Sequence, residues 1–237
     1  MTLAVDIGGT GIKLMLLDAS GRAASERVRE KTPQPATPRA VLRTVAALAA
    51  RLPGYDRVSV GFPGVVEEGV VRTATNLHPA WIGLRPSERL RGLLGKAVRV
   101  ANDADVQGLG IVEGRGVELV MTLGTGVGSA LFLDGRLIPN LELGHHPFRR
   151  GRTYEQQLGD RTLKRVGHRR WNRRVRRAVD LLIQTFNCRR IYLGGGNARL
   201  VTTSLPKQAR VANNLAGLLG GIRLWDDADP TGRRGAR

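Results

Sequence analysis

Short apolar segments separated by glycine-rich turns dominate the pattern of hydrophobic and polar positions along this chain. Two pairs of such segments are predicted to be strands: Leu3 to Ile7 with Ile12 to Leu17, and Leu119 to Leu123 with Ser129 to Leu133. The turns between the paired strands are Gly8-Gly9-Thr10-Gly11 and Gly124-Thr125-Gly126-Val127-Gly128. Two strand-turn-strand units of this kind indicate that the chain contains two related lobes.

Further elements follow from the same patterns. Strands are expected at Val58 to Phe62, Val98 to Ala101 and Ile191 to Leu193, and helices at Pro38 to Arg51, Pro86 to Leu94 and Arg169 to Asn187. The last helix has the clearest period, because Trp171, Val175 and Val179 recur at a spacing of four. Its opposite face is basic. The tail after Pro230 is predicted to be frayed.

The length of the chain permits two lobes with a cleft between them. At 237 residues and 41% hydrophobic content, two small cores are affordable. We expect an N-terminal lobe over residues 1–103 and a C-terminal lobe over residues 104–237, with the last helix returning to the N-terminal lobe. The fold class expected from these elements is α/β.

Cellular location is predicted from what the sequence lacks. A single cysteine, Cys188, excludes an internal disulfide and a zinc site made of several thiolates. No signal peptide precedes the first strand, and no run of eighteen apolar residues occurs. We therefore expect a cytoplasmic protein that makes no membrane contact.

The net charge of +18 bears on the choice of partner, because much of the positive charge is concentrated in one segment. Residues 149–177 hold twelve basic residues against two acids. A polyanion is a candidate partner for such a segment. The alternatives are a solvated cationic surface and a contact with nucleic acid, of which nucleic acid is the less favoured.

The two glycine turns are suited to phosphate, because glycine lets backbone N–H groups point together at an anion. Thr10 and Thr125 add hydroxyl groups. Neither turn matches the Walker or the dinucleotide-binding pattern, and Gly124 to Gly128 is followed by a strand where those patterns need a helix. The alternative is that both are structural hairpin turns.

Polar residues at other turns are candidates for catalysis and for sugar binding. Asp103 follows Asn102 at a strand end, where a carboxylate can accept the proton of an attacking hydroxyl group; the alternative is a helix cap. Glu142 to Pro147 combines an acid with two histidines, as a polyol site requires. A zinc site is the rival interpretation there, but a third convincing ligand is lacking.

The order of the motifs identifies a family. The motifs are Asp6-Ile7-Gly8-Gly9-Thr10-Gly11-Ile12-Lys13, Gly61-Phe62-Pro63-Gly64, Asn76-Leu77-His78-Pro79, Asn102-Asp103-Ala104-Asp105, Leu123 to Gly128, Glu142-Leu143-Gly144-His145 and Leu193-Gly194-Gly195-Gly196. Over residues 3 to 224 the chain resembles the ROK (repressor, open reading frame, kinase) sugar kinases, most closely their polyphosphate glucokinase branch. That resemblance implies an actin-like ATPase (ribonuclease H-like) fold of two lobes with a central cleft, and a homodimer.

The resemblance also implies roles for individual residues. Asp103 would be the general base on the 6-hydroxyl of glucose, and Asn76, Asn102, Asp103, Glu142, His145 and Glu155 would hold the sugar. Asp6, Gly8, Gly9, Thr10, Lys13, Gly124, Thr125, Gly126 and Gly195 would hold the phosphoryl donor, with Asp6 binding Mg²⁺ through water. Arg169, Arg170, Arg173, Arg174 and Arg177 would form a track for polyphosphate.

One departure from the family pattern carries information. Many members have a cysteine-rich zinc motif after the histidine of the Glu-x-Gly-His segment, whereas Pro147 to Thr153 contains no cysteine here. We therefore expect no structural zinc.

The sequence thus predicts a glucokinase that uses inorganic polyphosphate, or ATP, together with Mg²⁺. A kinase for another hexose or an amino sugar is one alternative, and a sugar- or polyanion-binding regulatory protein without catalysis is another.

Overall fold

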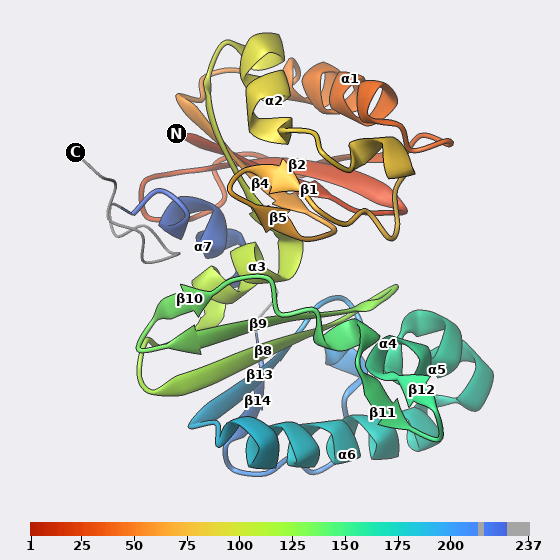
Figure 1. The fold of residues 1–237 in the computed structure, drawn as a ribbon. Coiled ribbons are helices and arrows are strands. Elements are labelled where there is room, and N and C mark those ends of the chain that lie inside the picture. The colour runs from red at the N-terminus through yellow and green to blue at the C-terminus, as the bar shows by residue number, and fades with distance from the viewer. Residues whose placement is uncertain (213–215, 227–237) are drawn as a thin grey trace. The chain divides into compact units, whose positions relative to one another are not determined.

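The computed structural model describes residues 1–212 and 216–226, which fall into two compact units (Figure 1). The first unit contains residues 1–110 and the described residues from Leu218 onward, and the second contains Ile111 to Gly217. The lobe boundary expected after residue 103 lies at the start of helix α3 (Asp103–Ile111). The tail predicted after Pro230 lies outside the described residues.

The first unit is built on a five-stranded mixed sheet in the order β3-β2-β1-β4-β7. Its strands are β1 (Thr2–Ile7), β2 (Gly11–Leu17), β3 (Val28–Lys31), β4 (Arg57–Phe62) and β7 (Ala97–Asn102). β1, β2 and β3 pair antiparallel, whereas β4 pairs parallel with both β1 and β7. The other elements are α1 (Pro38–Ala49), α2 (Pro86–Leu94), α3 and the small hairpin of β5 (Val66–Glu67) and β6 (Val70–Val71).

The second unit repeats this topology in the order β10-β9-β8-β13-β14. Its strands are β8 (Val117–Leu123), β9 (Val127–Leu133), β10 (Arg136–Ile138), β13 (Arg190–Gly194) and β14 (Ala209–Val211). Three strands again pair antiparallel and two add in parallel. The hairpin of β11 (Pro147–Arg149) and β12 (Arg152–Thr153) precedes helices α4 (Tyr154–Leu158), α5 (Asp160–Val166) and α6 (His168–Phe186). The repetition confirms the two related strand-turn-strand units.

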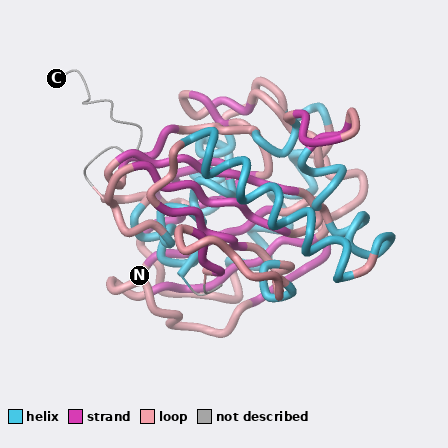
Figure 2. The backbone as a smooth tube through the Cα atoms, turned by 90° about the horizontal axis from the view of Figure 1, so that it is seen from below, coloured by secondary structure: helices cyan, strands magenta, loops and turns pink. Residues whose placement is uncertain are grey.

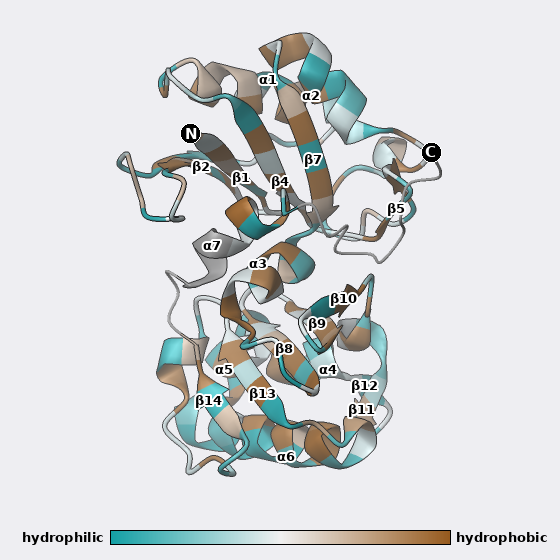
Figure 3. Cartoon of the chain, turned by 90° about the vertical axis from the view of Figure 1, so that its left-hand side faces the viewer, coloured by the Kyte–Doolittle hydropathy of each residue, from teal (hydrophilic) through white to brown (hydrophobic). Residues whose placement is uncertain are grey.

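Each unit has a hydrophobic core of its own. In the first, alternate residues of β1, namely Leu3, Val5 and Ile7, are buried beneath α1. In the second, α6 runs across the strands (Figure 2) and buries Trp171 and Val175. Hydrophobic and hydrophilic residues therefore alternate along α6 in Figure 3, as its sequence period predicts.

The last described residues of the chain lie in the first unit. Helix α7 (Ala216–Arg223) packs closely there: a Cβ atom added to Gly220 would lie 1.6 Å from the Val106 carbonyl oxygen. Trp225 then donates from its ring nitrogen to the Ser59 hydroxyl at 2.7 Å. The guanidinium groups of Arg57 and Arg99 lie 5.1 and 4.6 Å from the Trp225 ring centre, which adds cation–π attraction.

Every strand and helix predicted from the sequence is present, with ends that differ by at most a few residues. Within residues 1–212 and 216–226, none of the helices combines the length and the apolar character needed to cross a bilayer.

Candidate active site

The first glycine turn joins β1 to β2 and is closed by backbone contacts. The Gly8 N–H donates to the Gly11 carbonyl at 3.0 Å, and the Thr32 hydroxyl donates to the Gly8 carbonyl. Lys13 lies opposite Asp6 in the strand register, and its Nζ is 2.8 Å from the Asp6 carboxylate. The turn therefore carries one paired acid and base at its stem.

Asn102 and Asp103 lie at the same edge of this sheet. β1, β4 and β7 run parallel, so their carboxyl ends, where open α/β sheets usually bind ligands, meet at one edge. Phe62 pairs in register with Asn102, and a Cβ atom on Gly61 would lie 3.3 Å from the Asp103 Cα. Strand pairing thus brings Asp103 beside the Gly61–Gly64 motif.

Asn102 is held firmly. It is 6% exposed, its Nδ2 donates to the Gly64 carbonyl at 3.2 Å, and its Oδ1 accepts from the Ala104 and Asp105 N–H groups at 2.8 and 3.2 Å. These bonds cap α3. Asp103 is half-buried, and its Oδ1 accepts from the Ala104 N–H at 2.8 Å.

Asn76 lies against the first glycine turn. A Cβ atom on Gly9 would lie 2.9 Å from the Asn76 Cβ and 3.1 Å from its carbonyl oxygen. Any side chain at residue 9 would therefore displace Asn76. In this unit the structure brings Gly9 and Asn76 together at one place, and Asn102 and Asp103 at another point of the same sheet edge.

The second glycine turn joins β8 to β9 and is braced by the end of the parallel strand β13. Gly195 has a φ of +82°, and a Cβ atom there would lie 2.4 Å from the Leu123 carbonyl oxygen. The Asn197 Nδ2 donates to the Gly124 carbonyl at 3.3 Å. Gly195 therefore packs against Leu123, which directly precedes Gly124 to Gly126.

Ser129 of β9 holds the Glu-x-Gly-His segment. Its hydroxyl donates to the Leu141 carbonyl and accepts from the Leu143 N–H at 3.1 Å. A Cβ atom on Gly144 would lie 2.2 Å from the Val127 carbonyl oxygen, so only glycine permits this approach. Glu142 and its neighbours are thus fixed against the strand that follows the second turn.

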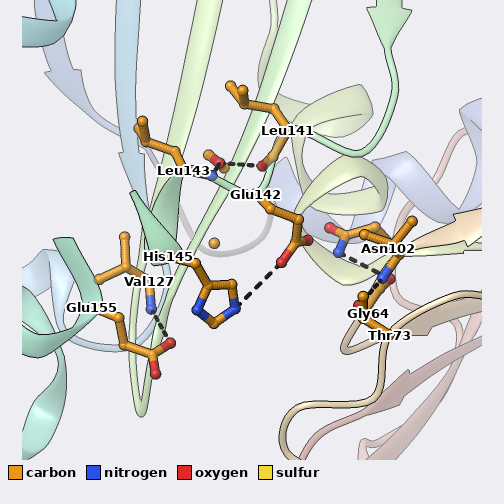
Figure 4. A network of polar contacts seen from close by, with 12 residues as sticks. Gly64, Thr73, Asn102, Val127, Leu141, Glu142, Leu143, His145 and Glu155 are labelled. Carbon is orange, nitrogen blue, oxygen red and sulfur yellow. Dashed lines mark hydrogen bonds and ion pairs between the residues drawn. The ribbon is translucent and has the colours of Figure 1, made fainter. Parts of the chain in front are cut away.

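Three predicted sugar ligands gather in the second unit (Figure 4). The His145 Nε2 is 3.5 Å from a Glu142 carboxylate oxygen, and Glu155 accepts from the Val127 N–H at 3.4 Å. Burial raises the pKa of the Glu142 carboxyl group, while His145 lowers it and the charge of Glu155 raises it further. These three side chains therefore interact electrostatically.

Glu155 also lies against the glycine turn. A Cβ atom on Gly126 would lie 2.3 Å from Glu155 Oε2. Thr153 caps α4 by accepting from the Gln156 N–H, which fixes the first turn of the helix that carries Glu155. The structure thus brings Glu155 to the predicted donor-binding turn as well as near Glu142.

The predicted arginine track lies on α6, but its members differ. Arg169, Arg170, Arg173 and Arg177 are exposed, whereas Arg174 is half-buried and donates to the Gln157 Oε1 at 2.6 Å. Arg174 therefore turns toward α4 and away from the exposed stripe. Its pKa is lowered by burial and then by Arg149, Arg165, Arg150 and Arg152.

Two kinds of residue escaped the sequence analysis. Asn197 follows the Gly194–Gly196 run directly, so that run itself could have pointed to it. Gln157 shows no local signal. The arginines of the β11–β12 hairpin belong to the basic segment 149–177, but only the fold brings them beside α6. Among the described residues, no group of three or more His, Cys, Asp and Glu side chains is arranged to hold a metal ion.

Two five-stranded sheets of the same topology, each with a glycine turn, define the class of this protein as the actin-like ATPase fold. The ROK family model matches residues 2–159, and the chain belongs to the ROK family. Both the fold and the family predicted from the sequence are confirmed.

Individual relatives agree with this family. The polyphosphate glucokinase of Mycobacterium leprae is 35% identical, over 91% of this chain and 72% of its own length. The crystal structure of the inorganic polyphosphate/ATP-glucomannokinase from Arthrobacter sp. strain KM is 34% identical, with a TM-score of 0.85 over 93% of this chain and 96% of its own. A ROK glucokinase from Streptomyces griseus, at 21% identity and a TM-score of 0.79 over 94% and 98%, shows the fold alone.

Proposed function

We propose that this chain transfers a phosphoryl group from inorganic polyphosphate, and from ATP as a second donor, to the 6-hydroxyl of glucose. The observation that carries the proposal is that Asp103 and the first glycine turn both lie at the edge where the parallel strands β1, β4 and β7 end. Phosphoryl transfer to an alcohol needs a proton acceptor and a phosphate clamp. The family supplies the reaction class, a sugar kinase.

The proposed roles follow the chemistry of the side chains. Asp103 accepts the proton of the attacking hydroxyl, and Asn102, which caps α3, fixes the backbone that carries it. The sugar hydroxyls bind to Asn76, Asn102, Glu142, His145 and Glu155. The donor binds to Asp6, Gly8, Gly9, Thr10, Lys13, Gly124, Thr125, Gly126 and Gly195.

Mg²⁺ fits this donor set. Magnesium usually keeps several waters and is bound through one or two carboxylates plus substrate phosphates. Asp6 offers one carboxylate beside the first glycine turn, and it is 42% exposed. Asp6 would hold the ion through water, and the bound ion would neutralise charge on the phosphate chain. Structural zinc forms no part of the proposal.

Polyphosphate is the proposed main donor because of the arginines near α6. A chain of linked phosphates presents many charges in a row, and more cations can contact it than can contact ATP. Relatives with 32–35% identity carry the name polyphosphate glucokinase. Counterion release would make such binding weaken steeply with salt. Location in the cytoplasm and assembly as a homodimer are further parts of the proposal.

A second hexose is an alternative acceptor. The Arthrobacter relative is named a glucomannokinase, and an N-acetylmannosamine kinase of Escherichia coli is 31% identical over 58% of this chain. An epimer at carbon 2 would present its hydroxyl differently to the sugar-binding residues. Mannose and N-acetylmannosamine are therefore tested beside glucose.

The test is the formation of glucose 6-phosphate with Mg²⁺, followed by a coupled dehydrogenase. Long-chain polyphosphate and ATP are supplied in parallel as the only donor. We expect turnover with polyphosphate to exceed turnover with ATP. The Asp103→Asn variant serves as the blank for contaminating kinases.

The other outcomes each reject part of the proposal. Turnover with ATP alone would reject polyphosphate as the main donor and leave a glucokinase. Turnover with another hexose alone would reject glucose. No turnover with any pair, combined with binding of a sugar or polyanion, would favour a regulatory protein without catalysis.

A further inference from the structure

Five arginines from three different elements lie near one another in the second unit. They are Arg149, Arg150 and Arg152 of the β11–β12 hairpin, Arg165 of α5 and Arg174 of α6, and we call them the arginine cluster. Figure 1 shows the hairpin beside α4, with α5 and α6 next to it. Only Arg174 belongs to the stripe predicted on α6.

A buried glutamine holds the cluster together. Gln157 of α4 is 5% exposed, its Nε2 donates to the Arg149 carbonyl at 3.3 Å, and its Oε1 accepts from Arg174 at 2.6 Å. One side chain thus joins the hairpin to α6. Arg165 donates to the Thr162 hydroxyl at 3.3 Å, which fixes it along α5. Arg149, Arg165 and Arg174 are therefore held in place by the fold.

The arginines lie close enough to repel one another. Burial lowers the pKa of the Arg174 guanidinium group, and Arg149, Arg165, Arg150 and Arg152 lower it further. Asp160 of α5 pairs with Lys164 at 2.6 Å, Asp180 of α6 pairs with Arg176 at 2.9 Å, and Glu155 of α4 accepts from the Val127 N–H. Within residues 1–212 and 216–226, none of the ion pairs involves a member of the cluster. An anionic ligand would relieve this repulsion.

The turn of the hairpin supports the same interpretation. Arg150 and Gly151 have φ values of +51° and +65°, which is the type I′ pattern. Asparagine and glycine are favoured at the first of these positions, and a non-glycine residue in this region is uncommon. The stability of the turn therefore does not account for an arginine at position 150, whereas a ligand would.

The aromatic residues near the cluster favour bare phosphate over nucleic acid. Proteins that bind single strands stack bases on exposed aromatic rings. Here Phe148 stacks on Tyr154 with ring centres 4.6 Å apart, and Tyr154 is 7% exposed. Trp171 is fully buried. These rings pack against each other or in the core, so they are not available to stack on bases.

We propose that the arginine cluster binds a stretch of inorganic polyphosphate chain, at a site separate from the exposed stripe on α6. The choice of polyphosphate as the ligand rests on the proposed function. Guanidinium groups bind phosphate oxygens through paired hydrogen bonds, so five of them hold several consecutive phosphates. The cluster thereby distinguishes long chains from short ones and from ATP.

The experiment compares two variants that lose the same charge. The cluster variant carries Arg150→Asn, Arg152→Gln and Arg165→Gln, and the control carries Arg115→Gln, Arg136→Gln and Arg161→Gln, all exposed arginines of the same unit. Binding of long-chain polyphosphate is measured by calorimetry at several salt concentrations, without glucose or Mg²⁺. We expect the cluster variant to bind at least about tenfold more weakly and its salt slope to fall by roughly two units.

The single variant Arg150→Asn separates binding from folding. Asparagine suits the positive φ, so the melting temperature should stay equal or rise while polyphosphate affinity falls. Equal affinity in the cluster and control variants would overturn the inference. So would a single-stranded oligonucleotide that binds as tightly as polyphosphate and is lost in the same variant.

Failure of the inference differs from failure of the proposed function. Turnover with polyphosphate that is equal in the cluster variant and the native chain rejects the cluster and leaves the kinase. Absence of turnover with every donor, together with cluster-dependent binding of polyphosphate, rejects the kinase and leaves the cluster.

Discussion

The side-chain oxygen of Asn102 accepts a hydrogen bond from the Ala104 N–H at 2.8 Å, which makes Asn102 a cap of α3. Sequence patterns left open whether Asp103 caps this helix or acts in catalysis. Asp103 also accepts from the Ala104 N–H, and Asn102 accepts from the Asp105 N–H as well. Asn102 therefore still caps α3 when Asp103 is replaced.

The Asp103→Asn variant is predicted to fold and to bind glucose but to lose turnover. An amide at this position cannot accept the hydroxyl proton, and loss of a general base lowers kcat by roughly 100-fold to 10,000-fold. Steady-state kinetics and glucose calorimetry measure the two effects. A rate equal to that of the native chain would remove Asp103 from the mechanism.

The Asn102→Ala variant is the matched structural control. It removes the bond to the Gly64 carbonyl and the cap, so unfolding should become easier by about 1–2 kcal/mol. Urea denaturation measures this loss. A larger loss of stability in Asp103→Asn than in Asn102→Ala would contradict the assignment of the cap.

Glu142 should give the protein a pH-dependent stability. Burial raises the pKa of its carboxyl group above the ordinary value of 4.5, so the folded state prefers the neutral form. This contribution is fully present below pH 4.5 and is lost as the pH rises through the raised folded pKa. Glu142→Gln should therefore melt higher than the native chain at neutral pH, with the gain vanishing in acid.

Glu155 provides the control for that titration. Its charge raises the pKa of Glu142, so Glu155→Gln should move the Glu142 transition to lower pH. Carbon-13 NMR of the Glu142 carboxyl group follows this transition in the native chain and in the variant. A transition that moves to higher pH would show that the two carboxylates do not repel each other.

Gly195→Ala is predicted to destabilise the second unit. The positive φ costs about 1–2 kcal/mol for a residue with a Cβ atom, and that atom would also meet the Leu123 backbone. Gly196→Ala is the neighbouring control, because nothing lies within 4 Å of an added Cβ there. Thermal melting should separate the two variants, and equal melting temperatures would refute the close packing.

Glu118 should be essential for the stability of the second sheet. It is fully buried and accepts from the N–H groups of Glu113, Gly114 and Arg115 and from the Tyr192 hydroxyl. Glu118→Gln should lower the free energy of unfolding by about 2–3 kcal/mol, because bonds to a charged acceptor are lost.

Tyr192→Phe isolates one of those four bonds. Burial, followed by the bond to Glu118, raises the pKa of the Tyr192 hydroxyl, so it remains a donor at neutral pH. Its removal should cost about 1 kcal/mol in urea denaturation. A cost as large as that of Glu118→Gln would mean that the three backbone bonds contribute little.

The sequence predicted the elements whose residues alternate or recur with a regular period. β1 and α6 bury one face each, and β4 is a short run that is buried on both faces from Val58 to Phe62, so their patterns are clear. β3 has the sequence Val-Arg-Glu-Lys and is mostly exposed at a sheet edge, and no apolar pattern marks it. The short helices α4 and α5 likewise lack enough turns to show a period.

Parts of the candidate site were predictable because they come directly after strands. Asp103, directly after β7, is of this kind, and Asp6 lies one residue before the end of β1. The arginine cluster was not, because a buried bond from Gln157 to Arg174 joins residues that are 17 positions apart, and only packing of α4 on α6 creates it. Local sequence shows charge, but it does not show which charges meet.

Helix α7 is synthesised after residues 111–217 of the second unit, but it packs in the first unit. Ser59, Arg57 and Arg99 leave the ribosome early, yet Trp225, which they contact, is made only after residues 111–217 of the second unit. The first unit therefore stays incomplete throughout translation of the second. A nascent chain halted before α7 should be cleaved by protease in the first unit, although its entire five-stranded sheet is already present.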